Sequence, residues 1–451
     1  MQRLPSRRSS LWPSPLSTLT PLLALVAFVS GCASGSGSSG AAMGPDGKPL
    51  PSLDPNLDWY GDNRQHLDAF LAEHGRGGAA HDPAHPPVAV FDWDNTVIKN
   101  DVGDATMFWM LRHDRILQPP GKNWALTSGF LTEAATTALD TACGALAEAG
   151  KPLPTSTSTA CADAILSVYT GSKTPGGAPA FSEYNHRWIE PAYAWLTQLQ
   201  AGYRPAEIAA FATAAIDEAL AADLDATQQV GSRADLTAAL RIYDPIRDLI
   251  HVLQQRDIAV WVVSASPQPV VEVFAERVGI PAERVIGVRL VPDAEGRLTA
   301  NLQGCGPIPD GSNDGQGSFT GNSLITYIEG KRCWINKVIY GDTGPTALGK
   351  NADPKKRPAF GAGDADTDIT FLQDATASKL VVNRNKPEIM CNAYRNLGGR
   401  WLVNPMFLAP KPRDEAGYPC STTACKDLKG APVACLDEAG QPIPDQTDDV
   451  F

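Results

Sequence analysis

The sequence has no excess of basic residues. Its 38 Lys and Arg residues are outnumbered by 50 Asp and Glu residues, and the formal net charge is −12 at pH 7. A nucleic-acid partner requires a basic face, and no basic stripe occurs along the chain. With 451 residues, of which 43% are hydrophobic and 20% charged, the chain is long enough for one large domain with an insertion or for two domains. We therefore expect a globular protein that does not bind nucleic acid.

The apolar run near the N-terminus, Leu22–Val29, is too short to form a stable transmembrane helix. It follows Arg3, Arg7 and Arg8, an arrangement typical of an export signal. The small residues before Cys32, in Val29-Ser30-Gly31-Cys32, resemble the bacterial lipobox. We therefore expect residues 1–32 to be a lipoprotein signal peptide. Acylation of Cys32 would anchor the exported protein to a membrane, facing the periplasm or the cell exterior. An ordinary secretory signal that leaves Cys32 as a thiol is the alternative.

Histidine is scarce, with seven residues, and none follows Cys391. This absence disfavours a zinc site built from the last three cysteines. If Cys32 is acylated, eight of the nine cysteines remain, an even set that suits an oxidising compartment. We predict disulfides Cys143–Cys161 and Cys305–Cys333, because each pair brackets a Pro- or Gly-rich loop. The pairing of the other four cysteines stays open.

Two carboxylates follow the short apolar stretch Val88–Phe91. Its β-branched residues predict a buried parallel strand, and ligands bind at the carboxyl ends of such strands. Asp92 and Asp94 are two residues apart, so on an extended backbone they share a face. Two carboxylates this close favour a shared proton or a bound cation, and Mg²⁺ suits them because it takes oxygen ligands. The alternative is an acidic turn in which Asn95 and Thr96 cap a helix.

Three later stretches carry similar chemistry. A second apolar strand begins at Ala259 and ends in Ser264-Ala265-Ser266. Lys331 follows Gly330 at the start of a predicted helix. A third strand, beginning at Ala359, opens into the acidic loop Gly363–Asp368. Each places a hydroxyl, an ammonium or a carboxylate at the end of a predicted element, where one reaction centre could use all of them.

In this order, Asp-x-Asp-x-Thr, a strand that ends in Ser, a Lys and Gly-Asp-x-x-x-Asp resemble the four motifs of the haloacid dehalogenase superfamily of phosphohydrolases. Within that superfamily the chain is similar to bacterial phosphorylcholine phosphatases and their phosphoserine phosphatase-like relatives, over roughly residues 86–405. The residues that carry this closer similarity are Asp92-Trp93-Asp94-Asn95-Thr96, Ser264-Ala265-Ser266, Arg284-Val285-Ile286-Gly287-Val288, Gly330-Lys331, Lys356-Arg357-Pro358, Ala362-Gly363-Asp364 and Val382-Asn383-Arg384.

The resemblance implies a role for each motif residue. Asp92 would be the nucleophile that forms a phosphoaspartyl intermediate. Asp94 would protonate the leaving oxygen and then deprotonate the attacking water. Lys331 would hold Asp92 ionised, with Lys337 as the alternative motif lysine. The implied phosphate-binding residues are Ser264, Ala265 and Lys331. The implied cofactor is Mg²⁺, held by the Asp92 carboxylate, the Asp94 backbone carbonyl and Asp364, with Asp368 orienting these ligands.

The predicted fold class is α/β, a haloacid dehalogenase-like doubly wound parallel sheet with a helical C1-type cap inserted after the first strand. Such a cap closes over the site and contacts the leaving group. Ala-rich patterns predict cap helices over 127–150 and 190–242. Further sheet strands are predicted at 258–264, 284–290, 358–363 and 378–382. The expected divisions are a signal peptide at 1–32, a flexible tether at 33–57, a core at 58–100 and 243–405, a cap at 101–242 and a Cys- and Pro-rich tail at 406–451.

Aromatic residues are frequent in and before the predicted cap. They are Phe108, Trp109, Trp124, Tyr184, Trp188, Tyr193 and Trp195. We expect most of them to pack in the core. The alternative is that two or three line a cage for a quaternary ammonium. The acidic residues Asp101, Asp104 and Glu183 would favour the same cationic leaving group.

The expected function is Mg²⁺-dependent hydrolysis of a small exported or environmental phosphate monoester, with phosphorylcholine as one candidate. A phosphoserine phosphatase or a broad-specificity acid phosphatase of the same fold is the first alternative. Phosphoryl transfer to an acceptor other than water and a non-catalytic surface lipoprotein that acts as a binding module are the others. The sequence leaves the oligomeric state open.

Overall fold

The protein is described by a computed structural model that covers residues 49–306 and 324–451. The predicted signal peptide, Cys32 and most of the tether lie outside the described residues. Residues 307–323, within the long excursion before Lys331, also lie outside them.

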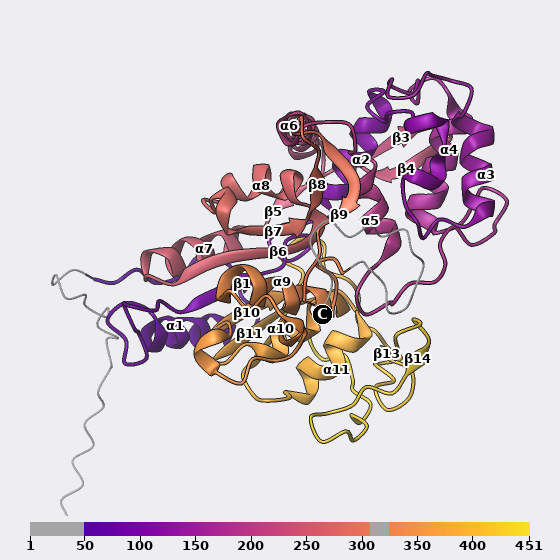
Figure 1. Ribbon diagram of the computed structural model, residues 1–451. Helices are drawn as coiled ribbons and strands as arrows, with labels where there is room; N and C mark the ends of the chain where they lie inside the picture. Colours follow the sequence, from indigo (N-terminus) through magenta and orange to yellow (C-terminus); the bar gives the residue numbers. More distant parts are fainter. Residues whose placement is uncertain (1–48, 307–323) are drawn as a thin grey trace, which may run out of the picture. The chain divides into compact units, whose positions relative to one another are not determined.

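Six parallel strands form the central sheet, in the order β12-β11-β10-β1-β6-β7 (Figure 1). They are β1 (Val88–Phe91), β6 (Ala259–Pro267), β7 (Val285–Val288), β10 (Phe360–Gly363), β11 (Ser378–Asn383) and β12 (Trp401–Pro405). The strand β1 lies in the middle and pairs in parallel with β6 on one side and β10 on the other. Because all six strands run in the same direction, their carboxyl ends meet at one edge of the sheet. The predicted α/β fold class and the predicted strands are confirmed.

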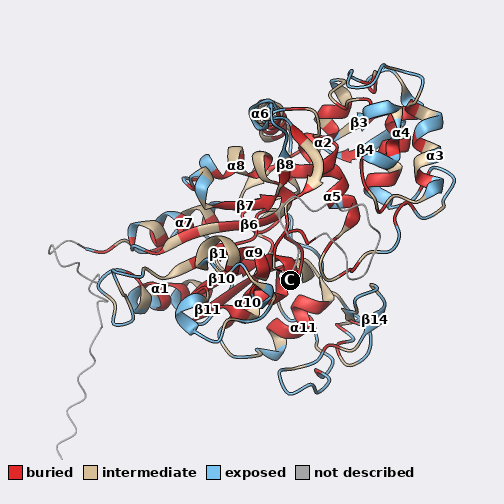
Figure 2. Ribbon diagram, viewed as in Figure 1, coloured by how far each residue is buried: buried red, intermediate tan, exposed pale blue. Residues whose placement is uncertain are grey.

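The sheet is apolar because it is covered by helices. Every residue of β7, β10 and β11 is buried (Figure 2). The surrounding helices are α1 (Asn63–His74), α7 (Asp244–Gln255), α8 (Gln268–Glu276), α9 (Glu329–Tyr340), α10 (Ile369–Asp374) and α11 (Pro387–Arg395). In α7, Ile246, Leu249, Ile250 and Leu253 are buried at the spacing of one helix face. Amphipathic helices of this kind bury one stripe against the sheet and leave the other in water.

The chain leaves the sheet at β2 (Ile98–Lys99) and returns at β5 (Arg241–Ile242), and these short strands pair with each other. The inserted helices are α2 (Val102–Arg112), α3 (Glu133–Cys143), α4 (Thr159–Gly171), α5 (Pro191–Gln198) and α6 (Pro205–Ala221). The prediction of an all-helical cap is wrong, because β3 (Thr227–Val230) and β4 (Arg233–Thr237) form an antiparallel hairpin. The helical pattern predicted over 190–242 forms the two helices α5 and α6, and α6 begins at Pro205, whose ring suits the first turn of a helix but not its interior.

Disulfides join all eight cysteines of the described residues. Cys143–Cys161 links α3 to α4, and Cys305–Cys333 links the segment after β9 (Leu298–Leu302) to α9. Both predicted pairings are confirmed. Cys391–Cys420 links α11 to the C-terminal tail, and Cys425–Cys435 lies within that tail. Between β7 and α9, β8 (Leu290–Pro292) pairs with β9 in an antiparallel hairpin. Within residues 49–306 and 324–451, no helix combines the length and the apolar character needed to cross a bilayer.

Candidate active site

The centre of the site is a buried ammonium between two carboxylates. The Lys331 side chain is 0% exposed, and its Nζ lies 2.5 Å from Asp92 Oδ1 and 2.6 Å from Asp368 Oδ1. Asp92 follows β1, Lys331 lies in the first turn of α9, and Asp368 precedes α10. Three elements far apart in the sequence therefore meet at the carboxyl edge of the sheet.

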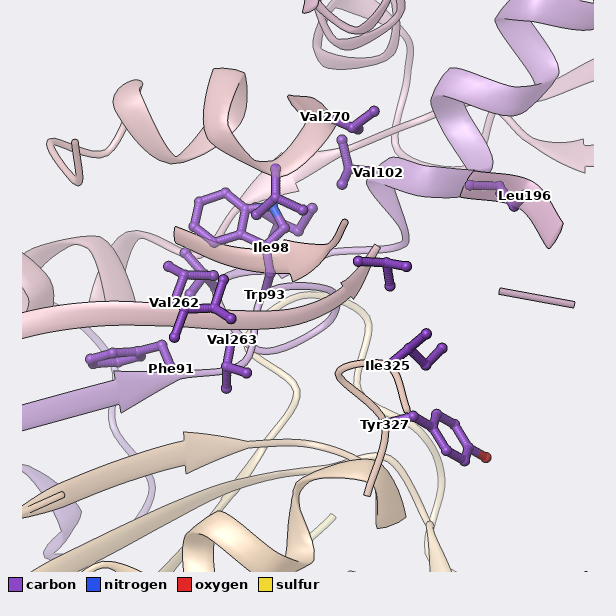
Figure 3. Packing of buried hydrophobic residues seen from close by; sticks show 14 of the residues in the cluster. Phe91, Trp93, Ile98, Val102, Leu196, Val262, Val263, Val270, Ile325 and Tyr327 are labelled. Atoms are coloured by element: carbon purple, nitrogen blue, oxygen red, sulfur yellow. The ribbon is translucent and has the colours of Figure 1, made fainter. Parts of the chain in front are cut away.

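Successive side chains after β1 point to opposite sides, so Asp92 and Asp94 point to one side and Trp93 to the other. Trp93, between them, is fully buried and packs edge-on against Phe274, with ring centroids 5.5 Å apart. Figure 3 shows Trp93 inside the apolar cluster that also contains Ile98 and Val262. Because Trp93 anchors this turn in the core, Asp92 and Asp94 are left to face the site.

Burial and charge act in opposite directions on the central pair. Burial raises the pKa of Asp92 to about 6, although the neighbouring Lys331 lowers it. For Lys331, burial lowers the pKa, but the carboxylates of Asp368 and Asp92 outweigh burial and raise it above the ordinary lysine value. Lys331 is therefore charged at neutral pH. Its charge favours the ionised form of Asp92, which is the form that a nucleophile needs.

Asp94 has a different environment from Asp92. Its Oδ1 accepts a hydrogen bond of 2.7 Å from the Val102 N–H, and its Oδ2 lies 2.8 Å from Ser266 Oγ and 3.3 Å from Ser264 Oγ. Burial and the negative charges of Asp101 and Asp92 raise the pKa of Asp94 well above its ordinary value. A carboxyl group with a raised pKa keeps its proton to a higher pH than an ordinary aspartic acid, which suits it to donate that proton to a leaving group.

The predicted phosphate-binding turn lies beside Asp94. Ser264 is fully buried, and its Oγ accepts a hydrogen bond of 3.1 Å from the Ser266 N–H. Ala265 and Ser266, rather than Ser264, line the cavity at the site. Ser266 was assigned no role from the sequence, although a second serine at the end of an apolar strand indicates a further hydroxyl group at the site.

Three buried carboxylates could hold a metal ion. Asp92, Asp364 and Asp368 each offer an oxygen atom, and these atoms all lie within 4.8 Å of one another. Thr96 Oγ1 lies 3.0 Å from Asp92 Oδ2 and 3.1 Å from Asp364 Oδ1, and so holds the first two together. Both oxygens of Asp368 are already engaged, Oδ1 with Lys331 and Oδ2 with the N–H groups of Asp364 and Ala365. Asp92 and Asp364 are therefore the better placed ligands, and Asp368 orients them. The carboxylate of Asp94 does not belong to this cluster.

The acidic loop after β10 has a cationic neighbour that the sequence analysis did not identify as functional. Arg384, which follows β11, donates a hydrogen bond of 2.5 Å to Asp364 Oδ2. Asp366 accepts a 3.0 Å hydrogen bond from the Ile389 N–H at the start of α11. Thr367 Oγ1 lies 3.2 Å from Asp368 Oδ1. These contacts stabilise the loop. In the sequence, Arg384 belongs to the stretch Val382-Asn383-Arg384 that carries part of the family similarity, but no role was assigned to it.

Lys337, the alternative motif lysine, lies elsewhere. Its Nζ donates a 2.8 Å hydrogen bond to Gly304 O and lies 4.7 Å from the ring centroid of Trp334. Among the two candidate lysines, only Lys331 contacts the motif carboxylates in these described residues.

A cavity of about 330 Å³ opens above Asp92, Asp94 and Lys331. The cap contributes Asp101, Asp104, Tyr169 and Tyr193 to its lining. Tyr169 donates a 2.6 Å hydrogen bond to Asp104. Tyr327 also lines the cavity, on the segment where Thr326 donates a hydrogen bond to Ser264 O.

Of the seven aromatic residues singled out in the sequence, Tyr193 alone lines this cavity. Phe108, Trp124 and Trp195 are buried in the core, as expected for most of the set. Trp188 donates a hydrogen bond to Glu329. The predicted cage is therefore wrong in its members, since Tyr169 and Tyr327 accompany Tyr193 and the tryptophans do not. The tryptophan rings pack in the hydrophobic core, and a sequence alone does not distinguish a core aromatic residue from one that lines a cavity.

Comparison with known proteins shows what part of the chain and its fold are similar to. Residues 157–315 match the family model of haloacid dehalogenase-like hydrolases. A conserved, functionally unknown protein from Anaerococcus prevotii DSM 20548 has a similar structure, with a TM-score of 0.56 and 20% identity over 78% of this chain and 94% of that chain. A protein of unknown function from Bordetella pertussis Tohama I gives a TM-score of 0.37 and 14% identity, over 71% of this chain and 98% of its own. The sequence has no significant match among curated proteins.

Part of the chain is therefore similar to haloacid dehalogenase-like hydrolases, in agreement with the motif resemblance. The matched segment includes Ser264 but not Asp92, Lys331 or Asp364. For those three residues the support is the geometry of the site.

Proposed function

We propose that the protein is a phosphomonoester hydrolase that acts through a phosphoaspartyl intermediate. The observation that carries the proposal is the buried contact of Lys331 with both Asp92 and Asp368, beside a second carboxyl group, Asp94, whose pKa is raised by burial. A charged nucleophile and a protonated acid two residues apart suit a displacement at phosphorus, because that reaction needs both at once.

The proposed reaction has two steps. In the first, Asp92 attacks phosphorus, an Asp92 oxygen–phosphorus bond forms, the ester oxygen–phosphorus bond breaks, and Asp94 gives its proton to the leaving oxygen. In the second, Asp94 takes a proton from water, the water oxygen attacks phosphorus, and the bond to Asp92 breaks, releasing inorganic phosphate. Lys331 offsets negative charge in both steps, and dividing one difficult displacement into two lowers each barrier.

The donor set fits Mg²⁺, because it consists of closely spaced carboxylate oxygens without nitrogen or sulfur. Asp92 and Asp364 would hold the ion, with Thr96 and Asp368 fixing their orientation. A bound Mg²⁺ would neutralise charge on the phosphoryl oxygens. Arg384 offsets part of the charge of Asp364 from the other side.

The first test is phosphate release from phosphorylcholine, phosphoserine, phosphoethanolamine and p-nitrophenyl phosphate, with Mg²⁺ and with a chelator. We expect release that stops on chelation and returns when Mg²⁺ is added. Since the pKa of Asp92 is about 6 in the metal-free protein, lowering the pH through that value protonates a ligand. The half-saturating Mg²⁺ concentration should therefore rise about 10-fold from about pH 7.5 to about pH 5. Release that is indifferent to chelation would refute the metal requirement.

Phosphorylcholine is one candidate ester, because Asp101 and Asp104 bring two carboxyl groups to the cavity beside Tyr193. Such groups suit an amine or a quaternary ammonium on the leaving group. A substrate preference among the four esters would test this feature. A folded protein that releases phosphate from none of them would favour the binding-module alternative.

We also propose that the protein is exported and anchored through Cys32. Four disulfides among the described residues support this, because such bonds persist in oxidising compartments. Cys32→Ser is expected to move the protein from the membrane fraction to the soluble exported fraction, as measured by fractionation and blotting. Recovery of the unaltered protein in the cytoplasm would contradict the proposal.

A further inference from the structure

The C-terminal tail reaches the cavity of the candidate active site. Within the tail, β13 (Cys425–Lys426) and β14 (Pro432–Val433) form a short hairpin. Lys426, on this hairpin, lines the same cavity as Asp92 and Lys331. This segment follows the last strand of the sheet, β12, in the chain, and it lies more than 300 residues after Asp92 in sequence. It nevertheless contributes to the site.

The hairpin is held in place by covalent and polar contacts. Cys425, next to Lys426, is joined to Cys435. The Cys391–Cys420 disulfide joins the preceding part of the tail to α11. At the tip of the hairpin, Leu428 O accepts a 2.8 Å hydrogen bond from the N–H of His186, which belongs to the segment before α5. The position of Lys426 is thus fixed from the tail, from the core and from the inserted segment.

The ammonium groups of Lys386 and Lys426 line the cavity together with the carboxyl group of Asp366. Burial raises the pKa of Asp366, and the charges of the two lysines oppose that rise. Neither Lys386 nor Lys426 forms an ion pair within 4.0 Å with any residue of 49–306 or 324–451. Of the other two cations of the lining, Arg384 is paired with Asp364 and Lys331 with Asp92 and Asp368. Burial, together with the nearby Arg384, lowers the pKa of Lys386. Because Asp364 is paired with Arg384, Lys386 and Lys426 share the single carboxyl group of Asp366, and a further anion that binds beside them would be stabilised.

Lys331 and Lys426 differ in burial, and this difference indicates which part of the substrate each one would contact. Lys331 is completely buried beside Asp92, whereas Lys426 is exposed on its hairpin. A phosphoryl group in contact with Asp92 would lie on the floor of the cavity, next to Lys331. Lys426 would then meet a part of the ester further from phosphorus, namely the leaving group.

We propose that the tail is part of the active site and that Lys426, together with Lys386, binds a second anionic group on the leaving group of the substrate. This inference rests on the proposed phosphatase function. With Asp101 and Asp104 on the cap side of the cavity, the preferred leaving group carries both an ammonium and a carboxylate. The Cys425–Cys435 disulfide holds the hairpin in the position that places Lys426 in the cavity lining.

Two esters that differ by one carboxylate test the proposal. Phosphoserine and phosphoethanolamine share the phosphate and the ammonium, and only phosphoserine has the carboxylate. Lys426→Ala is expected to raise the KM for phosphoserine about 10-fold, the effect of losing one hydrogen bond between charged groups. It should change the KM for phosphoethanolamine less than about 2-fold, because that ester offers Lys426 no partner. Lys429→Ala, on the same hairpin but outside the cavity lining, is the matched control and should alter neither value.

Removing the disulfide gives a second, independent test. The double variant Cys425→Ala with Cys435→Ala should raise the KM for phosphoserine while leaving the kcat for p-nitrophenyl phosphate within about 2-fold, because the chemistry on Asp92 does not involve the tail. A thermal unfolding curve confirms that the rest of the protein stays folded.

The outcomes separate this inference from the proposed function. Equal losses for both esters in Lys426→Ala, or no loss for either, would overturn the inference while leaving phosphatase activity on p-nitrophenyl phosphate intact. If the unaltered protein hydrolyses none of the three esters, the proposed function fails and the inference fails with it. A selective loss for phosphoserine supports both.

Discussion

Replacing Asp92 with asparagine is expected to lower phosphate release by a factor on the order of 10³ or more. Asparagine has nearly the same shape and still accepts a hydrogen bond from Lys331, but its amide cannot form the phosphoaspartyl bond. The loss should therefore appear in kcat, with the folded structure retained. Steady-state phosphate release, beside circular dichroism and a thermal unfolding curve, measures both.

Asp235→Asn is a suitable control for Asp92→Asn. Asp235 lies on the exposed face of the β3–β4 hairpin and pairs only with its neighbour Arg233 among the described residues. This variant should keep full activity. Substantial activity in a folded Asp92→Asn protein would mean that the reaction uses another nucleophile or none.

Replacing Lys331 with methionine is expected to damage both activity and stability. The change removes the only cation within 4.0 Å of Asp92 and of Asp368 among the described residues, and it leaves two carboxylates buried together. Breaking a buried ion pair in this way lowers the free energy of unfolding by about 3–5 kcal/mol. Phosphate release should fall by a factor on the order of 10³, because the charge that stabilises the attack is lost. Chemical denaturation and the phosphate assay give the two values.

Lys337→Met is the matched comparison, in the same helix. The contacts of Lys337 with Gly304 and Trp334 are remote from the motif carboxylates, so its loss should lower the free energy of unfolding by about 1 kcal/mol. Activity should stay within about 2-fold of that of the unaltered protein. If Lys337→Met proved inactive and Lys331→Met active, the assignment of the motif lysine would be reversed.

The central sheet could be predicted because its strands are apolar on both faces. Val88–Phe91 and the run from Ala259 are nearly continuous stretches of β-branched and aromatic residues, a pattern that few other elements produce. The polar residues that end these runs fall at one edge of a parallel sheet by geometry alone. This is why Asp92, Asp94 and Asp364 could be grouped before their positions were known. The strand β12 was missed, since Trp401–Pro405 includes an asparagine and a proline that disfavour a strand.

The cap was harder to predict, for physical reasons. The hairpin at 227–237 is mostly exposed, so its residues show little of the alternation that marks a half-buried strand. Its alanine-rich surroundings favour helix, and the prediction followed them. The sequence did not show which aromatic residues lie in the core and which line the cavity, because the burial of an aromatic ring depends on tertiary packing.

The contribution of Lys426 could not be inferred from the sequence, because it depends on long-range contacts. A lysine beside a cysteine in a Pro- and Gly-rich tail has no local feature that marks it as functional. Its place in the cavity follows from the Cys391–Cys420 and Cys425–Cys435 disulfides and from the contact with His186. Arg384 lies in a stretch that the sequence comparison had marked, but its pairing with Asp364, 20 residues away in sequence, depends on the fold.

The most direct test of the account is to trap the intermediate. The protein would be mixed with p-nitrophenyl phosphate and Mg²⁺, quenched in acid during turnover, digested, and examined by mass spectrometry for a peptide that carries one phosphoryl group. We predict that the phosphoryl group is on the Asp92 side chain and that Asp92→Asn yields no phosphorylated peptide. Phosphorylation of a different residue, or full turnover with no covalent intermediate, would contradict it.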